Sequence, residues 1–173
     1  MTESFSDSVV DCLVRDDRWK EVLPGFESLC SDAIQTALKM GGQNPDKAVE
    51  IAVLFADDIF VQDLNARYRG KDRATNVLSF PAEAELPFSA VKSHPLPLGS
   101  VALAYETVLR EAQDQGKSIP AHVRHLIVHG ILHLLGYDHQ TDSDAEQMEQ
   151  LEIMILQSLG DPDPYQWQSE AAE

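Results

Sequence analysis

The stretch HGILHLLGYDH, from His129 to His139, contains three of the six histidines of this 173-residue chain. If these residues form a helix, His129 and His133 are four positions apart and both imidazoles project from one face. Gly136 can adopt the left-handed conformation that ends a helix and turns the chain back, which returns His139 to the same face. The spacing therefore predicts that three imidazole nitrogens meet at one point, each about 2.0–2.1 Å from a metal ion.

Three neutral imidazoles favour zinc, although nickel, copper or cobalt accept the same ligands. A structural zinc site usually has four protein ligands, whereas three ligands leave a position for water or substrate. We therefore expect one zinc ion per chain, in a site that attracts anionic substrates such as phosphodiesters. Asp138, directly before the third ligand, is expected either to orient that ligand or to cap the helix that follows.

Two further histidines, His122 and His125, lie on the same predicted helix but are not expected to bind this metal. His122 precedes His129 by seven residues, roughly 10 Å along a helix, which is too far for the same coordination sphere. We expect His122 and His125 either at the surface or in the surroundings of the metal site.

Hydrophobic periodicity predicts an α+β fold, in which a small mixed β-sheet is surrounded by helices and the metal site lies at the end of one helix. Strands are predicted at about Val10–Val14, Val49–Phe55, Thr75–Phe80 and Leu98–Ala104. Helices are predicted at about Glu27–Met40, from Asp57 to Gly70, and at Tyr105–Gln115, Pro120–Gly136 and Ser143–Leu159.

The same patterns make predictions about faces, loops and domains. In the helix after Asp57, we expect the side chains of Ile59, Leu64 and Tyr68 to face the core. Residues 82–97 contain several prolines and no period, so they are expected to form a long surface loop. Residues 161–173 are expected to form a polar, frayed tail. Because no repeat or linker interrupts the chain, residues 1–173 are expected to form one domain.

The composition is typical of a soluble globular protein, with 43% hydrophobic and 24% charged residues. No run approaches the ~18 apolar residues that a membrane span needs, and the acidic N-terminal sequence lacks the pattern of a signal peptide. Cys12 and Cys30 match no metal or redox spacing, so both are expected to be reduced thiols. We therefore expect a cytoplasmic protein without a membrane partner.

Charge is distributed unevenly along the chain. The formal net charge of −16 opposes binding of nucleic acid by the surface as a whole. The segment RYRGKDR, from Arg67 to Arg73, nevertheless contains four cations and one anion, and no lysine or arginine follows Arg124. This basic segment is therefore either an ordinary solvated helix end or the part of the surface that binds phosphates.

HLIVHGILHLLGYDH (residues 125–139) and LNARYRGKDRATNVLSFP (residues 64–81) together closely resemble the YbeY family of bacterial ribosomal RNA maturation endoribonucleases. The resemblance implies a zincin-like α+β fold, a zinc ion held by His129, His133 and His139, and a catalytically important arginine at Arg69. It also implies a single-strand-specific endoribonuclease that acts in maturation of the 3′ end of small-subunit ribosomal RNA and in ribosome quality control. The implied partners are ribosomal RNA and the ribosome, with ribosomal proteins or GTPase assembly factors.

In an RNA-cleaving site, the guanidinium of Arg69 is suited to bind the phosphodiester and to stabilise the charge that develops on its oxygens. We expect Arg67, Lys71 and Arg73 to hold the RNA backbone and Tyr68 to stack on a base. No general base is evident. The nucleophile is either a metal-activated hydroxide or the ribose hydroxyl of the RNA.

Two other functions stay open. The histidine spacing is also that of the metzincin proteases, so the first alternative is a zincin-type metalloprotease or amidase. Gly130, at the position of the glutamate base of those enzymes, and the basic segment both count against it. The second alternative is a non-catalytic, zinc-stabilised ribosome assembly factor, which a metal with an open coordination position disfavours.

Overall fold

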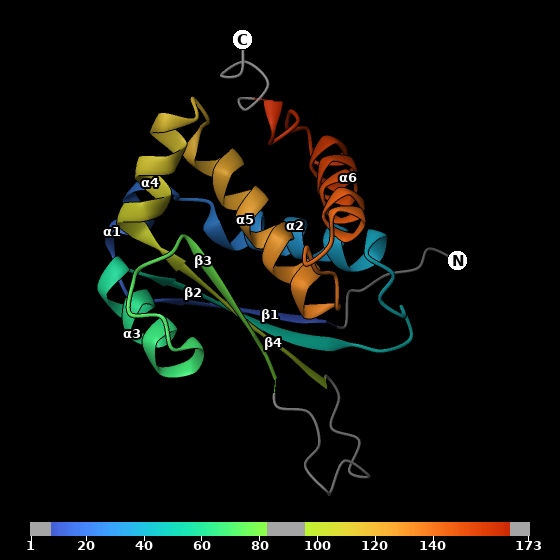
Figure 1. The fold of residues 1–173 in the computed structure, drawn as a ribbon, viewed down its shortest axis with the longest axis horizontal. Coiled ribbons are helices and arrows are strands. Elements are labelled where there is room, and N and C mark those ends of the chain that lie inside the picture. Colours follow the sequence, from blue (N-terminus) through green and yellow to red (C-terminus); the bar gives the residue numbers. More distant parts are fainter. Residues whose placement is uncertain (1–7, 83–95, 167–173) are drawn as a thin grey trace, which may run out of the picture.

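The computed structural model describes residues 8–82 and 96–166 (Figure 1). Its strands pair in the order β1-β2-β4-β3, with β1, β2 and β4 parallel and β3 antiparallel to β4. The predicted α+β fold with a small mixed sheet is therefore confirmed. The elements in chain order are β1 (Val9–Val14), α1 (Arg18–Val22), α2 (Phe26–Met40), β2 (Val49–Ala56), α3 (Asp58–Arg69), β3 (Val77–Pro81), β4 (Leu96–Ala104), α4 (Tyr105–Asp114), α5 (Ile119–Leu134) and α6 (Asp142–Ser158).

Helices cover both faces of the sheet. Alternate residues of a strand point to opposite faces. Val101 and Leu103 of β4 therefore belong to the large core with α2 and α5, whereas Ala102 and Ala104 pack in a smaller cluster with Val61 of α3. Helix α5 contacts α2, α4, α6 and the sheet, and Figure 1 shows it in the middle of the molecule. Among the described residues, no helix has the length and apolar character needed to cross a bilayer.

Helix α1, which the sequence patterns did not predict, places Trp19 in the core. Its side chain is fully buried, and its indole N–H donates a hydrogen bond to the carbonyl of Ala56 at 2.8 Å. The ring packs edge-on against Phe55 and Tyr105. A helix of five residues is not stable by itself, so tertiary contacts of this side chain hold it in place.

The predicted inner face of α3 was wrong for two of its three residues. Ile59 and Tyr68 are 77% and 69% exposed. The side chain of Leu64 is half-buried against the smaller cluster, as predicted, but Val61 and Asn65 supply the fully buried positions. The sheet lies on one side of the helix only, and its position selects which apolar residues are covered.

Two predicted boundaries were also wrong. Strand β4 begins at Leu96, so the predicted 82–97 loop ends earlier; residues 83–95 of that loop lie outside the described residues. Residues 161–166 of the predicted frayed tail pack against the protein. The carboxylate of Asp161 accepts hydrogen bonds from Arg124 at 2.6 and 2.8 Å, and Pro164 is buried. Residues 167–173 lie outside the described residues.

Candidate active site

The three predicted metal ligands come together at the C-terminal end of α5. The hydroxyl of Ser118 caps the other end of this helix, and His129 and His133 lie one turn apart near its last residue. Gly136, with a φ of 101°, turns the chain so that His139 reaches the other two. The ligand nitrogens of the three residues all lie within 4.8 Å of one another.

The hydrogen bonds of these rings test whether a metal fits. The Nδ1 atom of His129 lies 3.2 Å from the carboxylate of Glu152, and that of His133 lies 3.0 Å from the carbonyl of Tyr137. Because both partners only accept, each Nδ1 carries the proton and each Nε2 carries a lone pair. The two Nε2 atoms face each other at 3.0 Å, where lone pairs repel unless a proton or cation lies between them. Burial lowers the pKa of His133, with a smaller effect from the charges of His129 and His139. This disfavours the proton, so the arrangement fits a metal cation.

Gly130 of α5 packs against strands β3 and β4. A Cβ atom at this position would lie 3.0 Å from Oγ of Ser79 and 3.1 Å from both methyl groups of Val101. The hydroxyl of Ser79 donates a hydrogen bond to the Gly130 carbonyl at 3.1 Å. Helix α5 therefore packs closely on β3 and β4 at this position, and a side chain at position 130 would require Ser79 and Val101 to shift by a few tenths of an ångström.

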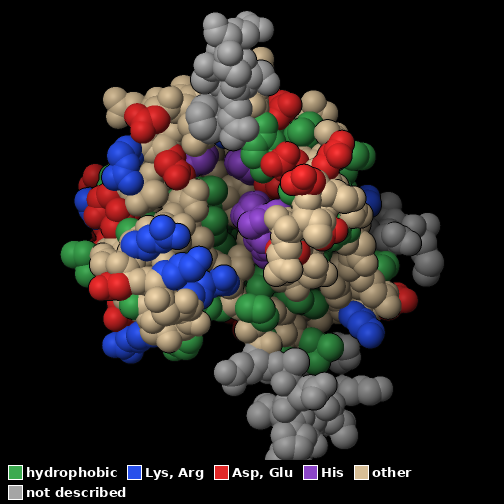
Figure 2. All heavy atoms as spheres, viewed as in Figure 1, with side chains coloured by type: hydrophobic (Ala, Val, Ile, Leu, Met, Phe, Trp, Pro, Cys, Tyr) green, Lys and Arg blue, Asp and Glu red, His purple; other side chains and the backbone are tan. Residues whose placement is uncertain are grey.

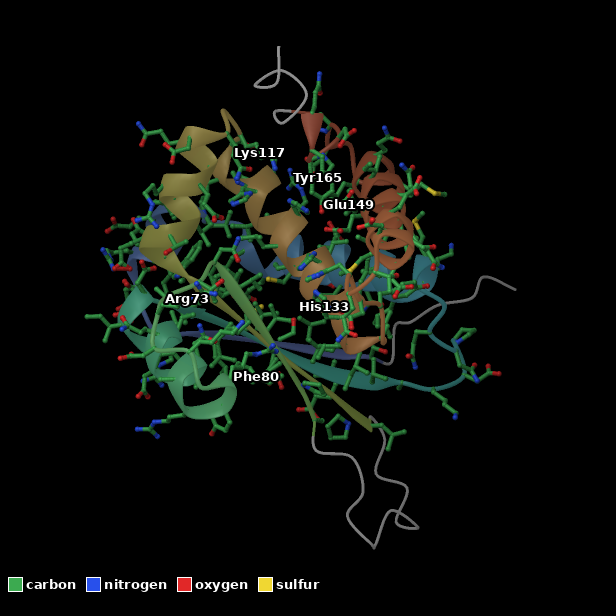
Figure 3. The ribbon with its side chains drawn as sticks, in the orientation of Figure 1. Arg73, Phe80, Lys117, His133, Glu149 and Tyr165 are labelled. Atoms are coloured by element: carbon green, nitrogen blue, oxygen red, sulfur yellow. The ribbon has the colours of Figure 1, made fainter. Side chains whose placement is uncertain are left out.

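The histidines line a cleft of about 830 Å³. Arg69, at the end of α3, and Lys71 and Arg73, in the connection from α3 to β3, contribute to the same lining. Figure 2 shows the histidines inside a hollow with lysine and arginine side chains along one side of it. In Figure 3, Arg73 and His133 are seen on either side of β3. The structure thus brings three of the predicted phosphate-binding side chains to the predicted metal ligands.

The other two residues predicted to bind RNA do not line this cleft. Arg67 forms an exposed ion pair with Asp63 at 3.1 Å. Tyr68 is exposed and packs edge-on against Phe80, with 5.6 Å between the ring centres. Backbone binding by Arg67 and base stacking by Tyr68 therefore stay predictions, for a surface outside the cleft.

Arg69 is held at the cleft by strand β3. Its Nη2 donates a hydrogen bond to the Ser79 carbonyl at 2.6 Å, and its guanidinium carbon lies 5.9 Å from the ring centre of Phe80. Within the described part of the chain this is its one hydrogen bond, so its other N–H donors remain for a phosphate. The Ser79 carbonyl accepts a hydrogen bond from Arg69, and the Ser79 hydroxyl donates one to Gly130 of α5, so this residue links the arginine to the helix that carries the ligands.

Sequence reasoning missed Glu152. This residue of α6 is 1% exposed. Its carboxylate accepts hydrogen bonds from His125 Nε2 at 2.9 Å, from His129 Nδ1 at 3.2 Å and from the hydroxyl of Tyr165 at 3.0 Å. Burial acts to raise the pKa of Glu152, but the hydrogen bonds from the two histidines outweigh it and lower that pKa to about 2. An ionised carboxylate therefore lies directly behind one of the predicted ligands.

His122 and His125 are buried, so the prediction of a surface position was wrong for both. Burial lowers the pKa of His125, and the neutral ring donates to the carboxylate of Glu152. His122 donates to Glu111 at 2.9 Å. His125 therefore lies in the surroundings of the metal site, which was the second of the two predicted positions. His122 lies further from the ligands.

Asp138 acts on the loop that carries the third ligand. Its carboxylate accepts the backbone N–H of His139 at 2.7 Å. Helix α6 is capped by Thr141, whose hydroxyl accepts the N–H of Asp144 at 3.1 Å, so the capping alternative for Asp138 was wrong. The hydrogen bonds found among residues 8–82 and 96–166 do not join Asp138 to an imidazole, and an orienting role through the backbone stays a prediction.

Two histidines one turn apart on a helix, a third after a glycine turn and a mixed sheet behind the helix define a zincin-like α+β protein with a candidate metal centre. The family model described as endoribonuclease YbeY matches residues 15–160. The chain therefore belongs to the YbeY family.

Individual relatives agree with this assignment. An endoribonuclease YbeY from Paramagnetospirillum magneticum is 47% identical over 148 residues, which cover 85% of this chain and 89% of the relative. Another from Rhodopseudomonas palustris is 47% identical over 171 residues, covering 97% and 96%. The solution structure of TM1509 from Thermotoga maritima aligns with 90% of this chain and 97% of its own, with a TM-score of 0.51 and 22% identity. That likeness shows a shared fold.

Proposed function

We propose that this protein is a metal-dependent endoribonuclease that cleaves phosphodiester bonds in the cleft between α5 and the α3–β3 connection. One observation carries the proposal: the three candidate metal ligands share this cleft with Arg69, Lys71 and Arg73, in a chain whose formal net charge is −16. A cationic cavity on an otherwise acidic molecule attracts a polyanion to one place and repels it elsewhere. The named endoribonucleases among its relatives support the same activity.

His129, His133 and His139 would hold the metal, and three neutral imidazoles favour zinc. When bound, the metal supplies a Lewis acid that polarises a phosphate oxygen. Arg69, anchored by its hydrogen bond to β3, donates to the phosphate oxygens and stabilises the charge that develops on them. Lys71 binds the RNA backbone beside the reacting phosphate and holds the strand in place.

A single-stranded substrate suits this site, because the histidines lie inside a hollow that a flexible strand enters more readily than a rigid duplex (Figure 2). From the family resemblance, we further propose maturation of the 3′ end of small-subunit ribosomal RNA and ribosome quality control as the setting, in the cytoplasm. Ribosomal proteins or GTPase assembly factors are the proposed protein partners.

The test uses purified protein with a ribosomal RNA fragment that carries a single-stranded 3′ extension, beside the same fragment made fully double-stranded. We expect cleavage of the extension, loss of cleavage with a zinc chelator, and no hydrolysis of casein. Because trace ribonuclease imitates this activity, an Arg69→Lys variant purified in the same way is the control. Cleavage that persists in chelator and in the variant, or casein hydrolysis without RNA cleavage, contradicts the proposal.

A further inference from the structure

Three donors from two separate parts of the chain converge on the carboxylate of Glu152 in α6. His125 and His129 come from α5, one turn apart, and Tyr165 comes from the segment after α6. The hydroxyl of Tyr165 lies 3.1 Å from one carboxylate oxygen and 3.0 Å from the other. Burying an ionised carboxylate is unfavourable unless hydrogen-bond donors surround it. Here the two imidazoles and the tyrosine hydroxyl provide these donors.

The contact to His129 has a chemical meaning. An imidazole that binds a metal through one ring nitrogen is normally oriented by an acceptor on the other, which fixes the tautomer and makes the ligand more basic. Glu152 is that acceptor for Nδ1 of His129, which leaves Nε2 directed toward Nε2 of His133. A rotation of the carboxylate away from His129 would release the ring.

The segment that carries Tyr165 is itself tied to α5. Asp161 forms two hydrogen bonds with Arg124 of that helix, and its side chain is 8% exposed. Tyr165 lines the same cleft as the histidines, and Figure 3 shows it between α5 and α6. Its hydroxyl is thereby held at a fixed place relative to the helix that carries the ligands.

We infer that Glu152 is a positioning residue for the metal ligand His129, and that Tyr165 acts through Glu152, so that residues 161–166 are part of the metal centre. The inference rests on the proposed metal site and is independent of whether the substrate is RNA. It gives residues 161–166, the described part of the predicted tail, a functional role, because Tyr165 restrains the carboxylate that orients a ligand.

The experiment measures the zinc dissociation constant, by competition with a chromogenic chelator, for wild type, Glu152→Gln, Tyr165→Phe and the double variant. Glu152→Gln keeps the shape of the side chain, and we expect zinc affinity to fall by roughly 10–100-fold. Tyr165→Phe removes one hydroxyl and should cause a smaller loss. Because Tyr165 acts through Glu152, the double variant should bind zinc no more weakly than Glu152→Gln.

Tyr105→Phe is the matched control, since it removes the hydroxyl of another half-buried tyrosine, one that packs against Trp19 away from the cleft. Its zinc affinity should equal that of wild type. The melting temperature of each metal-free variant is measured in parallel. A merely structural role of the carboxylate would lower that temperature and leave zinc affinity unchanged.

Three results overturn the inference. If Glu152→Gln folds and binds zinc as tightly as wild type, Glu152 does not position His129. If the losses of the single variants add in the double variant, Tyr165 does not act through Glu152. If wild type binds no zinc, the metal site is wrong as well, which distinguishes that failure from the first two. Should Glu152→Gln fail to fold, wild-type affinity in Tyr165→Phe still refutes the role of the tyrosine.

Discussion

Replacing Arg69 by lysine separates the charge of this side chain from its geometry. In the structure one N–H donor is used on the Ser79 carbonyl at 2.6 Å, and the planar guanidinium has further donors for a phosphate. Lysine keeps the charge but cannot hold the carbonyl and also form two parallel hydrogen bonds to phosphate. Loss of one donor that acts in the transition state lowers turnover by roughly 10²–10³-fold, or about 2.7–4 kcal/mol. Because Arg69 is exposed, the free energy of unfolding should change by less than about 0.5 kcal/mol.

The assay is single-turnover cleavage at saturating RNA, with RNA affinity measured alongside. Arg67→Lys is the matched control, because it makes the same substitution on the same helix at a residue that pairs with Asp63 outside the cleft. Lys71→Ala should weaken RNA binding, with less effect on turnover. The slope of the logarithm of the RNA binding constant against the logarithm of salt concentration should become shallower by about 0.7, the value for one lost single-strand phosphate contact. If Arg69→Lys cleaves saturating RNA at the wild-type rate, the catalytic role is refuted and the cleft cations only bind RNA.

Other outcomes follow from the same geometry. His133→Ala should lose most of the bound zinc, whereas His122→Ala should retain it. His122→Ala should instead lower the free energy of unfolding by roughly 2 kcal/mol, because a buried hydrogen-bonded ring is removed. Metal analysis measures the first effect and denaturant unfolding the second. Chelator should lower the melting temperature at neutral pH. The ligands bind only as neutral imidazoles, so the stabilisation by metal is present above a pH of about 6.5 and shrinks below it. The lowered pKa of His133 shifts the loss of this stabilisation to lower pH. A difference in melting temperature between metal-bound and metal-free protein that stays constant between about pH 7.5 and 5.5 would contradict histidine ligation. Gly130→Glu should lower the free energy of unfolding by roughly 1–3 kcal/mol, because the added side chain crowds Ser79 and Val101. A stable Gly130→Glu protein that hydrolyses casein would revive the protease alternative.

The candidate ligands could be predicted from the sequence because their geometry is local. The positions of His129 and His133 on one helix face follow from four-residue spacing, and Gly136 provides the left-handed turn that the structure shows. The strand predicted at Val49–Phe55 was confirmed for the same reason, as strand β2 differs from it by one residue. None of these features requires knowledge of which distant segments meet.

The surroundings of the ligands were decided by the tertiary structure. Glu152 is 23 residues from His129, and Tyr165 is 40 residues from His125. One signal was available, because Glu152 lies between Met148 and Ile155 on the buried stripe of α6, where an acid is rarely buried without a partner. Even so, the sequence could not say which partner α6 brings to it.

The same limit applies to the faces of helices. Helix α3 has apolar residues around its circumference, and hydrophobicity alone could not choose between Ile59, which is exposed, and Val61, which is buried. The cationic cleft likewise forms only when β3 pairs with β4 and brings Arg69 beside α5. Spacing along the chain determines which side chains share a local surface, whereas the sheet and helices packed against that surface determine which of them are covered, paired or left facing the cleft.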